Sequence, residues 1–121
     1  MNWIDILIAA AMVTAFLAYR RSGLISIKDA QAHLKNGAMV IDVRTAGEFV
    51  VGHLPVAVNL PLSEIETNLS RRVTDKNQVL LLHCQSGARS GAARKKLLAL
   101  GCPNVFNMGS YARAERIVSG K

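Results

Sequence analysis

A short, largely apolar run from Val79 to His83 leads directly into a loop, and an amphipathic helical stretch follows from Ser90 to Leu100. Two further apolar runs lie at Ala38–Ile41 and Ala57–Leu60. Short runs without polar alternation are typical of strands that a parallel sheet buries on both faces. Because helical stretches separate these runs, the sequence predicts an α/β fold with a mostly parallel central sheet flanked by helices.

Capping and turn residues place the other elements. Ser26, with Asp29 three residues later, predicts the start of a helix that runs from about Ile27 to Lys35, and Gly37 ends it. The strand that follows ends at Asp42. The remaining expected elements are a turn-rich stretch at 47–55, a polar helix at 62–69, a strand at 105–107 and a short C-terminal helix.

The first part of the chain differs in composition from the rest. Residues 3–19 are apolar apart from Asp5 and Thr14, with Trp3 and Tyr19 at the two ends. As a helix this run is about 26 Å long, and aromatic rings favour the headgroup layers of a bilayer. We therefore expect a transmembrane helix at 1–21 that contacts the membrane through residues 3–19, and one compact domain at 22–121.

Basic residues orient the expected membrane helix. Arg20, Arg21 and Lys28 follow the apolar run, so the positive-inside rule predicts a single-pass membrane protein whose domain faces the cytoplasm. A cleaved signal peptide is the alternative interpretation of the segment. Such a peptide normally has its basic residues before the apolar run, whereas here they come after it.

Charge and cysteine content exclude several classes of partner. The net charge is +7, but the basic residues are scattered and only Arg94–Lys96 form a run of three, so no nucleic-acid partner is expected. Cys84 and Cys102 are the only cysteines, which excludes a disulfide-stapled scaffold, and no Cys/His cluster has the spacing of a zinc site. We expect no metal and no cofactor. A basic surface suits small anionic substrates.

The loop that follows Val79–His83 carries the candidate chemistry. Ligands in open α/β sheets bind beyond the carboxyl ends of the strands, where loop N–H groups and a helix N-terminus form a nest for negative charge. Cys84 lies at the floor of this nest. Helix N-termini and nearby arginine lower a cysteine pKa from about 8.5 to roughly 3.5–7.5, so Cys84 is the expected nucleophile. The alternative is a buried cysteine that acts as a small apolar residue.

Two neighbours of Cys84 suit this chemistry. Gly87 lets the backbone curl, and Arg89 can hold an oxyanion above the sulfur. Asp42 ends a strand at the same sheet edge and is a candidate support for the loop, through hydrogen bonds from its backbone or from Arg89. A turn-capping role is the alternative for Asp42.

The segment resembles the active-site loop of the rhodanese family, in which a cysteine, four residues that include a glycine, and Arg-Ser follow one another. A second block resembles the family in the same order along the chain. It comprises Val40–Arg44, Glu48-Phe49, Gly52–Pro55 and Ala57–Pro61, and with the later Gly101 and Asn104-Val105 the resemblance covers about 25–109.

The resemblance implies a thiosulfate sulfurtransferase. Cys84 takes the outer sulfur of a donor such as thiosulfate as a persulfide and passes it to a thiophilic acceptor, cyanide or a thiol. Arg89 orients the sulfonate end of the donor. The loop backbone holds the transferred sulfur, and its residues are Gln85, Ser86, Gly87, Ala88 and Ser90.

Two other functions share these features. Cysteine-dependent phosphatases and arsenate reductases use a similar anion loop, but with five residues between Cys and Arg where this chain has four, Gln85–Ala88. A rhodanese-like module that only binds a partner usually lacks the cysteine.

Several polar residues are expected to be structural. Arg44 and Glu48 have the spacing of a helical ion pair. His53 suits a turn, and a base is the alternative role. Cys102 suits the turn at Gly101–Pro103, and resolution of the persulfide as a disulfide is the alternative role. His83 precedes the nucleophile, and we assign it no catalytic role.

Overall fold

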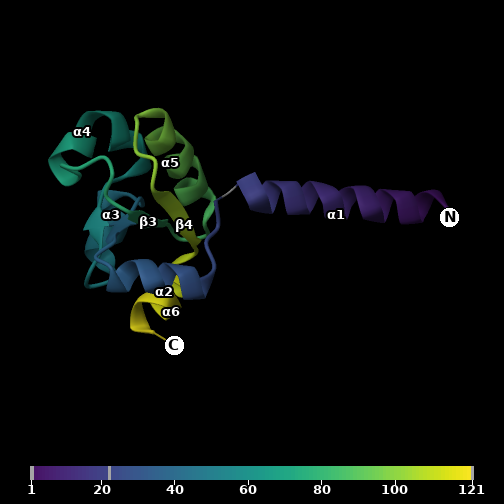
Figure 1. Ribbon diagram of the computed structural model, residues 1–121, viewed down its shortest axis with the longest axis horizontal. Coiled ribbons are helices and arrows are strands. Elements are labelled where there is room, and N and C mark those ends of the chain that lie inside the picture. The colour runs from purple at the N-terminus through teal and green to yellow at the C-terminus, as the bar shows by residue number, and fades with distance from the viewer. Residues whose placement is uncertain (1, 22, 121) are drawn as a thin grey trace.

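The computed structural model of the protein describes residues 2–21 and 23–120, with Arg20 and Arg21 as backbone only. Figure 1 shows an α/β domain from which the first helix extends. The elements are α1 (Trp3–Arg21), α2 (Ile27–Lys35), β1 (Met39–Asp42), α3 (Ala46–Val51), β2 (Val58–Asn59), the 3₁₀ helix η1 (Leu62–Glu64), α4 (Ile65–Arg72), β3 (Leu80–His83), α5 (Ala88–Ala99), β4 (Val105–Gly109) and α6 (Tyr111–Ser119).

The sheet is parallel throughout, in the order β2-β1-β3-β4. Asp42 at the end of β1 lies opposite Asn59 in β2 and His83 in β3. An irregularity after Leu82 brings His83 opposite Gly109 in β4. The carboxyl ends of all four strands therefore meet at one edge, as parallel pairing requires, and the Cys84 loop begins there.

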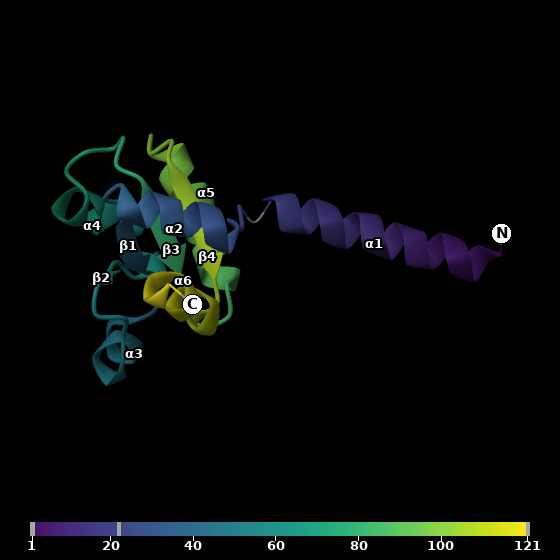
Figure 2. The ribbon, with the colours of Figure 1, turned by 60° about the horizontal axis from the view of Figure 1, so that its bottom comes forward.

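Helices cover both faces of the sheet, and each face has its own core. Figure 2 shows α2 and α6 over the near face of the sheet, with α3 standing apart at one end. Alternate strand residues point to opposite faces: Ile41 and Leu82 pack with the α4 and α5 residues, whereas Val40 and Leu81 pack with those of α2 and α6. This burial on both faces explains the apolar strands and confirms the predicted fold class.

The observed bounds differ from the predicted ones at two places that matter for the site. The stretch expected to be turns contains α3, because Thr45 accepts a hydrogen bond from the backbone N–H of Glu48 and completes a capping box with its side chain. Helix α5 begins at Ala88 and not at Ser90. Ala88 and Arg89 are therefore in the first helical turn. The predicted N-cap at Ser26 is confirmed.

The first helix corrects an expectation. Within residues 2–21 and 23–120, no helix combines the length and apolar character needed to cross a membrane. Asp5 lies in the first turn of α1, and only Ile6–Tyr19 separates it from Arg20. As a helix this stretch spans about 21 Å, against a hydrocarbon core of ~30 Å. The predictions of a transmembrane helix at 1–21 and of a single-pass membrane localisation are therefore wrong.

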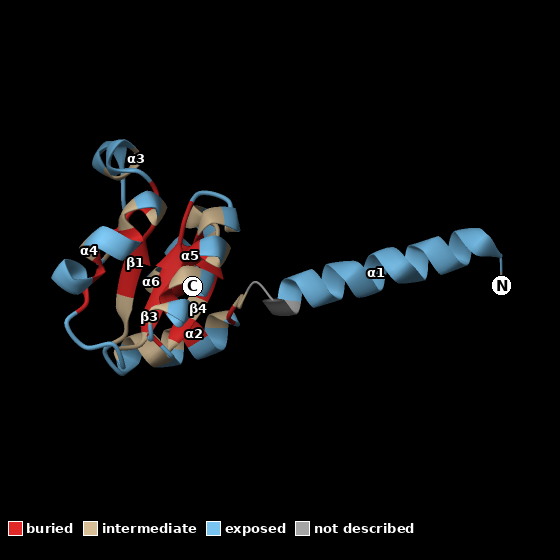
Figure 3. Cartoon of the chain, turned by 90° about the horizontal axis from the view of Figure 1, so that it is seen from above, coloured by how far each residue is buried: buried red, intermediate tan, exposed pale blue. Residues whose placement is uncertain are grey.

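Side chains on α1 are exposed from Trp3 to Tyr19 (Figure 3). Three residues at the ends of the expected segments 1–21 and 22–121 lie outside the described residues, and they are Met1, Ser22 and Lys121. The side chains of Arg20 and Arg21 also lie outside the described residues, and the expected orientation rested on them together with Lys28.

A buried ion pair lies at the carboxyl edge of the sheet. Arg44 Nε donates to both carboxylate oxygens of Asp42, at 3.0 and 3.1 Å, and a terminal guanidinium nitrogen reaches Asp42 Oδ2 at 2.7 Å. The same nitrogen donates to the carbonyl of Gly52 at 2.7 Å, and the guanidinium lies over the ring of Tyr111. The pair thus ties β1 to the end of α3 and to α6.

We expect Arg44→Met to lower the free energy of unfolding by about 3–5 kcal/mol, because it leaves the buried Asp42 carboxylate without its cation. Urea unfolding followed by circular dichroism measures this. The double variant Asp42→Leu/Arg44→Met removes both charges and should recover part of the loss. A double variant as unstable as Arg44→Met would show that packing, and not the unpaired charge, sets the cost.

Candidate active site

The loop between β3 and α5 holds Cys84 in a tight turn. Gly87 is the N-cap of α5 and has a φ of 100°, in the left-handed region that favours glycine. A Cβ at this position would lie 3.3 Å from the Cα of Gly109. Gly87 is therefore needed both for the turn and for the close approach of the end of β4.

Backbone and side-chain donors surround the sulfur of Cys84. The N–H of Gly87 donates to Sγ at 2.9 Å, and the hydroxyl of Ser90 lies 3.5 Å from it. Cys84 itself has no exposed surface, and its N–H donates to the carbonyl of Gly109 at 3.3 Å. The Gly87 N–H and the Ser90 hydroxyl are thus the donors closest to this sulfur.

Two opposing effects act on the thiol. Burial is the largest single influence and favours the neutral form. Hydrogen bonds from the side chain and backbone of Ser90 and from the backbone of Gly87 and Ser86 favour the thiolate, and together they lower the pKa of Cys84 below its ordinary value. The loop thus stabilises negative charge on a sulfur that is shielded from water.

Asn107 in β4 fixes the start of α5, a role that the sequence analysis did not identify. Its Oδ1 accepts hydrogen bonds from the Ser90 hydroxyl at 2.7 Å and from the N–H of Gly109 at 2.8 Å. Its Nδ2 donates to the carbonyl of Gly87 at 3.3 Å. An asparagine within an apolar strand was the available signal, because a buried amide needs partners.

Arg89 is held by Glu48. The two terminal guanidinium nitrogens donate to the two carboxylate oxygens of Glu48 at 2.6 and 3.0 Å. Hydrogen bonds from Arg89, and then from Thr45, hold the pKa of Glu48 at about 2. The Arg44–Glu48 pair expected from the sequence does not form, because α3 begins at Ala46 and Arg44 lies outside the helix.

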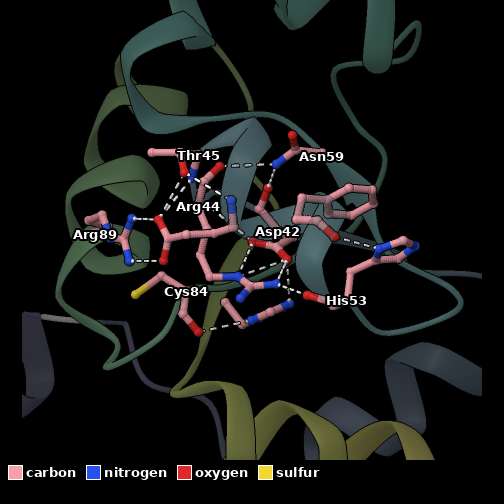
Figure 4. Close-up of polar contacts among 11 residues, drawn as sticks. Asp42, Arg44, Thr45, His53, Asn59, Cys84 and Arg89 are labelled. Carbon is pink, nitrogen blue, oxygen red and sulfur yellow. Dashed lines mark hydrogen bonds and ion pairs between the residues drawn. The ribbon is translucent and has the colours of Figure 1, made fainter.

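Asp42 and His83 lie beneath the loop, in the buried part of the site. Asp42 binds Arg44, whereas the hydrogen bond that the sequence suggested from Arg89 goes to Glu48 (Figure 4). His83 Nδ1 lies 3.0 Å from the carbonyl of Cys84, and its Nε2 is 3.7 Å from Asp42 Oδ2. Burial, more than any other effect, lowers the pKa of His83 and favours its neutral form.

The other residues singled out from the sequence have simple surroundings. Gln85, Ser86 and Ala88 are exposed. His53 stacks on Phe49 and contacts its carbonyl at 2.7 Å, consistent with a role in the turn. Cys102 is a buried free thiol in the core. Nowhere in residues 2–21 and 23–120 do three His, Cys, Asp or Glu side chains gather as metal ligands would.

The chain is similar to curated sulfurtransferases. It is 35% identical over 69 residues to the thiosulfate sulfurtransferase PspE of Escherichia coli, in a match that covers 57% of this chain and 66% of PspE. The chain thus spans slightly less than two thirds of the length of that relative.

Solved structures and a family model agree with this similarity. The human single-domain sulfurtransferase TSTD1 superposes with a TM-score of 0.67 and 26% identity, over 78% of this chain and 96% of that one. A rhodanese from E. coli, solved with anions, gives a TM-score of 0.60 and 31% identity, over 64% and 91%. The model of the rhodanese-like domain matches residues 26–113, and the chain belongs to this family.

Proposed function

We propose that the protein is a thiosulfate sulfurtransferase that carries sulfur as a persulfide on Cys84. The observation that carries the proposal is the set of hydrogen-bond donors around Cys84 Sγ, among which the N–H of Gly87 lies at 2.9 Å. These donors stabilise a thiolate before the reaction and a persulfide after it, because both species place negative charge within the loop. The sulfurtransferases among its relatives support this assignment.

The proposed first step is attack by the Cys84 thiolate on the outer sulfur of thiosulfate. A new S–S bond forms, the S–S bond of the donor breaks, and sulfite leaves with its electron pair. In the second step a thiolate or cyanide attacks the outer sulfur of the persulfide and the Cys84 thiolate is released. Charge is conserved in both steps, and neither step needs a metal or a redox cofactor.

Arg89 is the proposed partner of the sulfonate end of the donor. It lies in the first turn of α5, directly after the loop that holds Cys84. The hydrogen bond to Glu48 is the main cause that raises the pKa of its guanidinium, and the charge of Cys84 is a smaller one. A planar guanidinium binds an oxyanion through two parallel hydrogen bonds. The related E. coli rhodanese solved with anions is consistent with such a site.

The proposed persulfide is tested by intact mass. After incubation with thiosulfate, we expect the purified protein to gain the mass of one sulfur atom and to lose it on treatment with cyanide. Cys84→Ser should show no gain, whereas Cys102→Ser should behave like the wild type. No gain with thiosulfate, polysulfide or mercaptopyruvate would refute the proposed function.

Ser90→Ala should raise the pKa of Cys84, because it removes a hydroxyl 3.5 Å from Sγ that can turn its proton from Asn107 to the thiolate. The alkylation rate rises with pH as the thiolate forms, so its midpoint should move to higher pH in this variant. Iodoacetamide labelling between pH 5 and 10 measures the midpoint, with Ser86→Ala as a control that keeps the backbone donor. An unchanged midpoint in Ser90→Ala would show that the hydroxyl does not act on the sulfur.

Arg89→Ala should lower kcat/KM for thiosulfate by roughly 10–100-fold, because charge and planar geometry are both lost. Arg89→Lys keeps the charge, so it should retain the alkylation profile of Cys84 better than thiosulfate turnover. Steady-state assays and alkylation rates against pH separate the two effects. Wild-type behaviour of both variants in both assays would mean that Arg89 has no part in the site.

A further inference from the structure

The carboxylate of Glu48 binds the guanidinium of Arg89, which is the group that a sulfonate would bind. It accepts hydrogen bonds from both terminal nitrogens of Arg89, at 2.6 and 3.0 Å. It also accepts hydrogen bonds from the backbone N–H and the hydroxyl of Thr45, at 3.2 and 3.1 Å. A donor with an oxyanion therefore meets an arginine whose paired N–H groups are already in use, next to a negative charge.

This ion pair is open to exchange. Its side chains are 36% and 35% exposed, whereas those of Arg44 and Asp42 are 7% and 0% exposed. Exposed ion pairs are weak because water screens and replaces them. A proton does not open the pair near neutral pH, since the pKa of Glu48 is about 2. Water or a competing anion, and not a proton, therefore releases Arg89.

We propose that Glu48 determines donor specificity, by competing with oxyanion-bearing donors for Arg89 and so favouring sulfane donors that have no oxyanion. This inference rests on the proposed sulfurtransferase function and adds the class of donor. Inorganic polysulfide represents the favoured class. Thiosulfate is still a substrate, but it must displace Glu48 from Arg89 and so has the higher KM. Polysulfide has no oxygen atoms to occupy the guanidinium fork, so Glu48 does not need to move.

Both donors lead to the same persulfide. With thiosulfate, the Cys84 thiolate takes the outer sulfur and sulfite leaves. With polysulfide, the thiolate attacks the terminal sulfur, the adjacent S–S bond breaks, and the shortened polysulfide leaves with the electron pair. The two donors therefore differ in the leaving group, which is sulfite or a shortened polysulfide. They differ also in whether Arg89 binds that group.

The test compares wild type with Glu48→Gln. Glutamine at this position still suits a capping box, but its neutral oxygen holds the guanidinium less tightly and so gives it up more readily to an oxyanion. We expect the KM for thiosulfate to fall roughly tenfold, with the rate of persulfide formation from polysulfide within about twofold of wild type. In a Cys84→Ser background, calorimetry should show tighter thiosulfate binding with Glu48→Gln.

Thr45→Val is the matched control. It removes the hydroxyl that caps α3 and one hydrogen bond to the Glu48 carboxylate, but it keeps the charge of Glu48 and both hydrogen bonds from Arg89. Its preference between the two donors should equal that of wild type. An unchanged donor preference in Glu48→Gln, or an equal change in Thr45→Val, would overturn the inference. Failure of the wild type to take sulfur from either donor would instead refute the proposed function.

Discussion

Burial of both faces of a parallel sheet is the constraint on which the rest of the structure depends. Helices cover β1 and β3 on each side, so their central residues are apolar. Buried polar side chains are found where the strands end. Among the described residues, the buried polar or charged ones gather at or beside this edge, and they are Asp42, Arg44, His83, Ser90 and Asn107. The fold thus concentrates its desolvated hydrogen-bonding groups around the Cys84 loop.

The same burial gives Cys84 its chemistry. Removing a thiol from water disfavours the thiolate, so an unassisted buried cysteine is inert. The loop reverses this with donors that are fixed before a substrate arrives. The left-handed turn sets the Gly87 N–H, and Asn107 holds the first turn of α5 through the Ser90 hydroxyl and the Gly87 carbonyl. Because Asn107 belongs to β4, the position of these donors depends on the sheet as much as on the loop. Fold stability and nucleophile activation are therefore coupled.

Local signals in the sequence were sufficient for the parallel α/β fold and for the candidate nucleophile. Strand runs, the Ser26 cap and the glycine after Cys84 each act over a few residues. The membrane helix was wrongly predicted, because the apolar length was counted over residues 3–19 although Asp5 limits the uncharged part to Ile6–Tyr19. Helix α3 was missed although Thr45 and Glu48 have the spacing of a capping box, because the helix has only six residues and buries none of them.

Contacts between distant parts of the chain could not be predicted in the same way. Arg89 and Glu48 are 41 residues apart, and Asn107 is 17 residues from Ser90. Each pair forms only when the strands lie side by side and bring their following loops together. The spacing of Arg44 and Glu48 was misleading for a related reason. The rule for helical pairs applies only when both residues lie on one helix, and Arg44 precedes the cap at Thr45.

The two arginine–carboxylate pairs of the site differ in burial, and this difference decides which pair is structural and which can bind a substrate. Both have short, multiple hydrogen bonds, so geometry alone does not distinguish them. In the buried Asp42–Arg44 pair, separation would leave two charges in an apolar region, so the pair is fixed for as long as the domain is folded. In the half-exposed Glu48–Arg89 pair, water or an anion can replace either partner at little cost. Only the second pair can therefore exchange with a substrate, and its arginine lies on the helix that begins at the Cys84 loop.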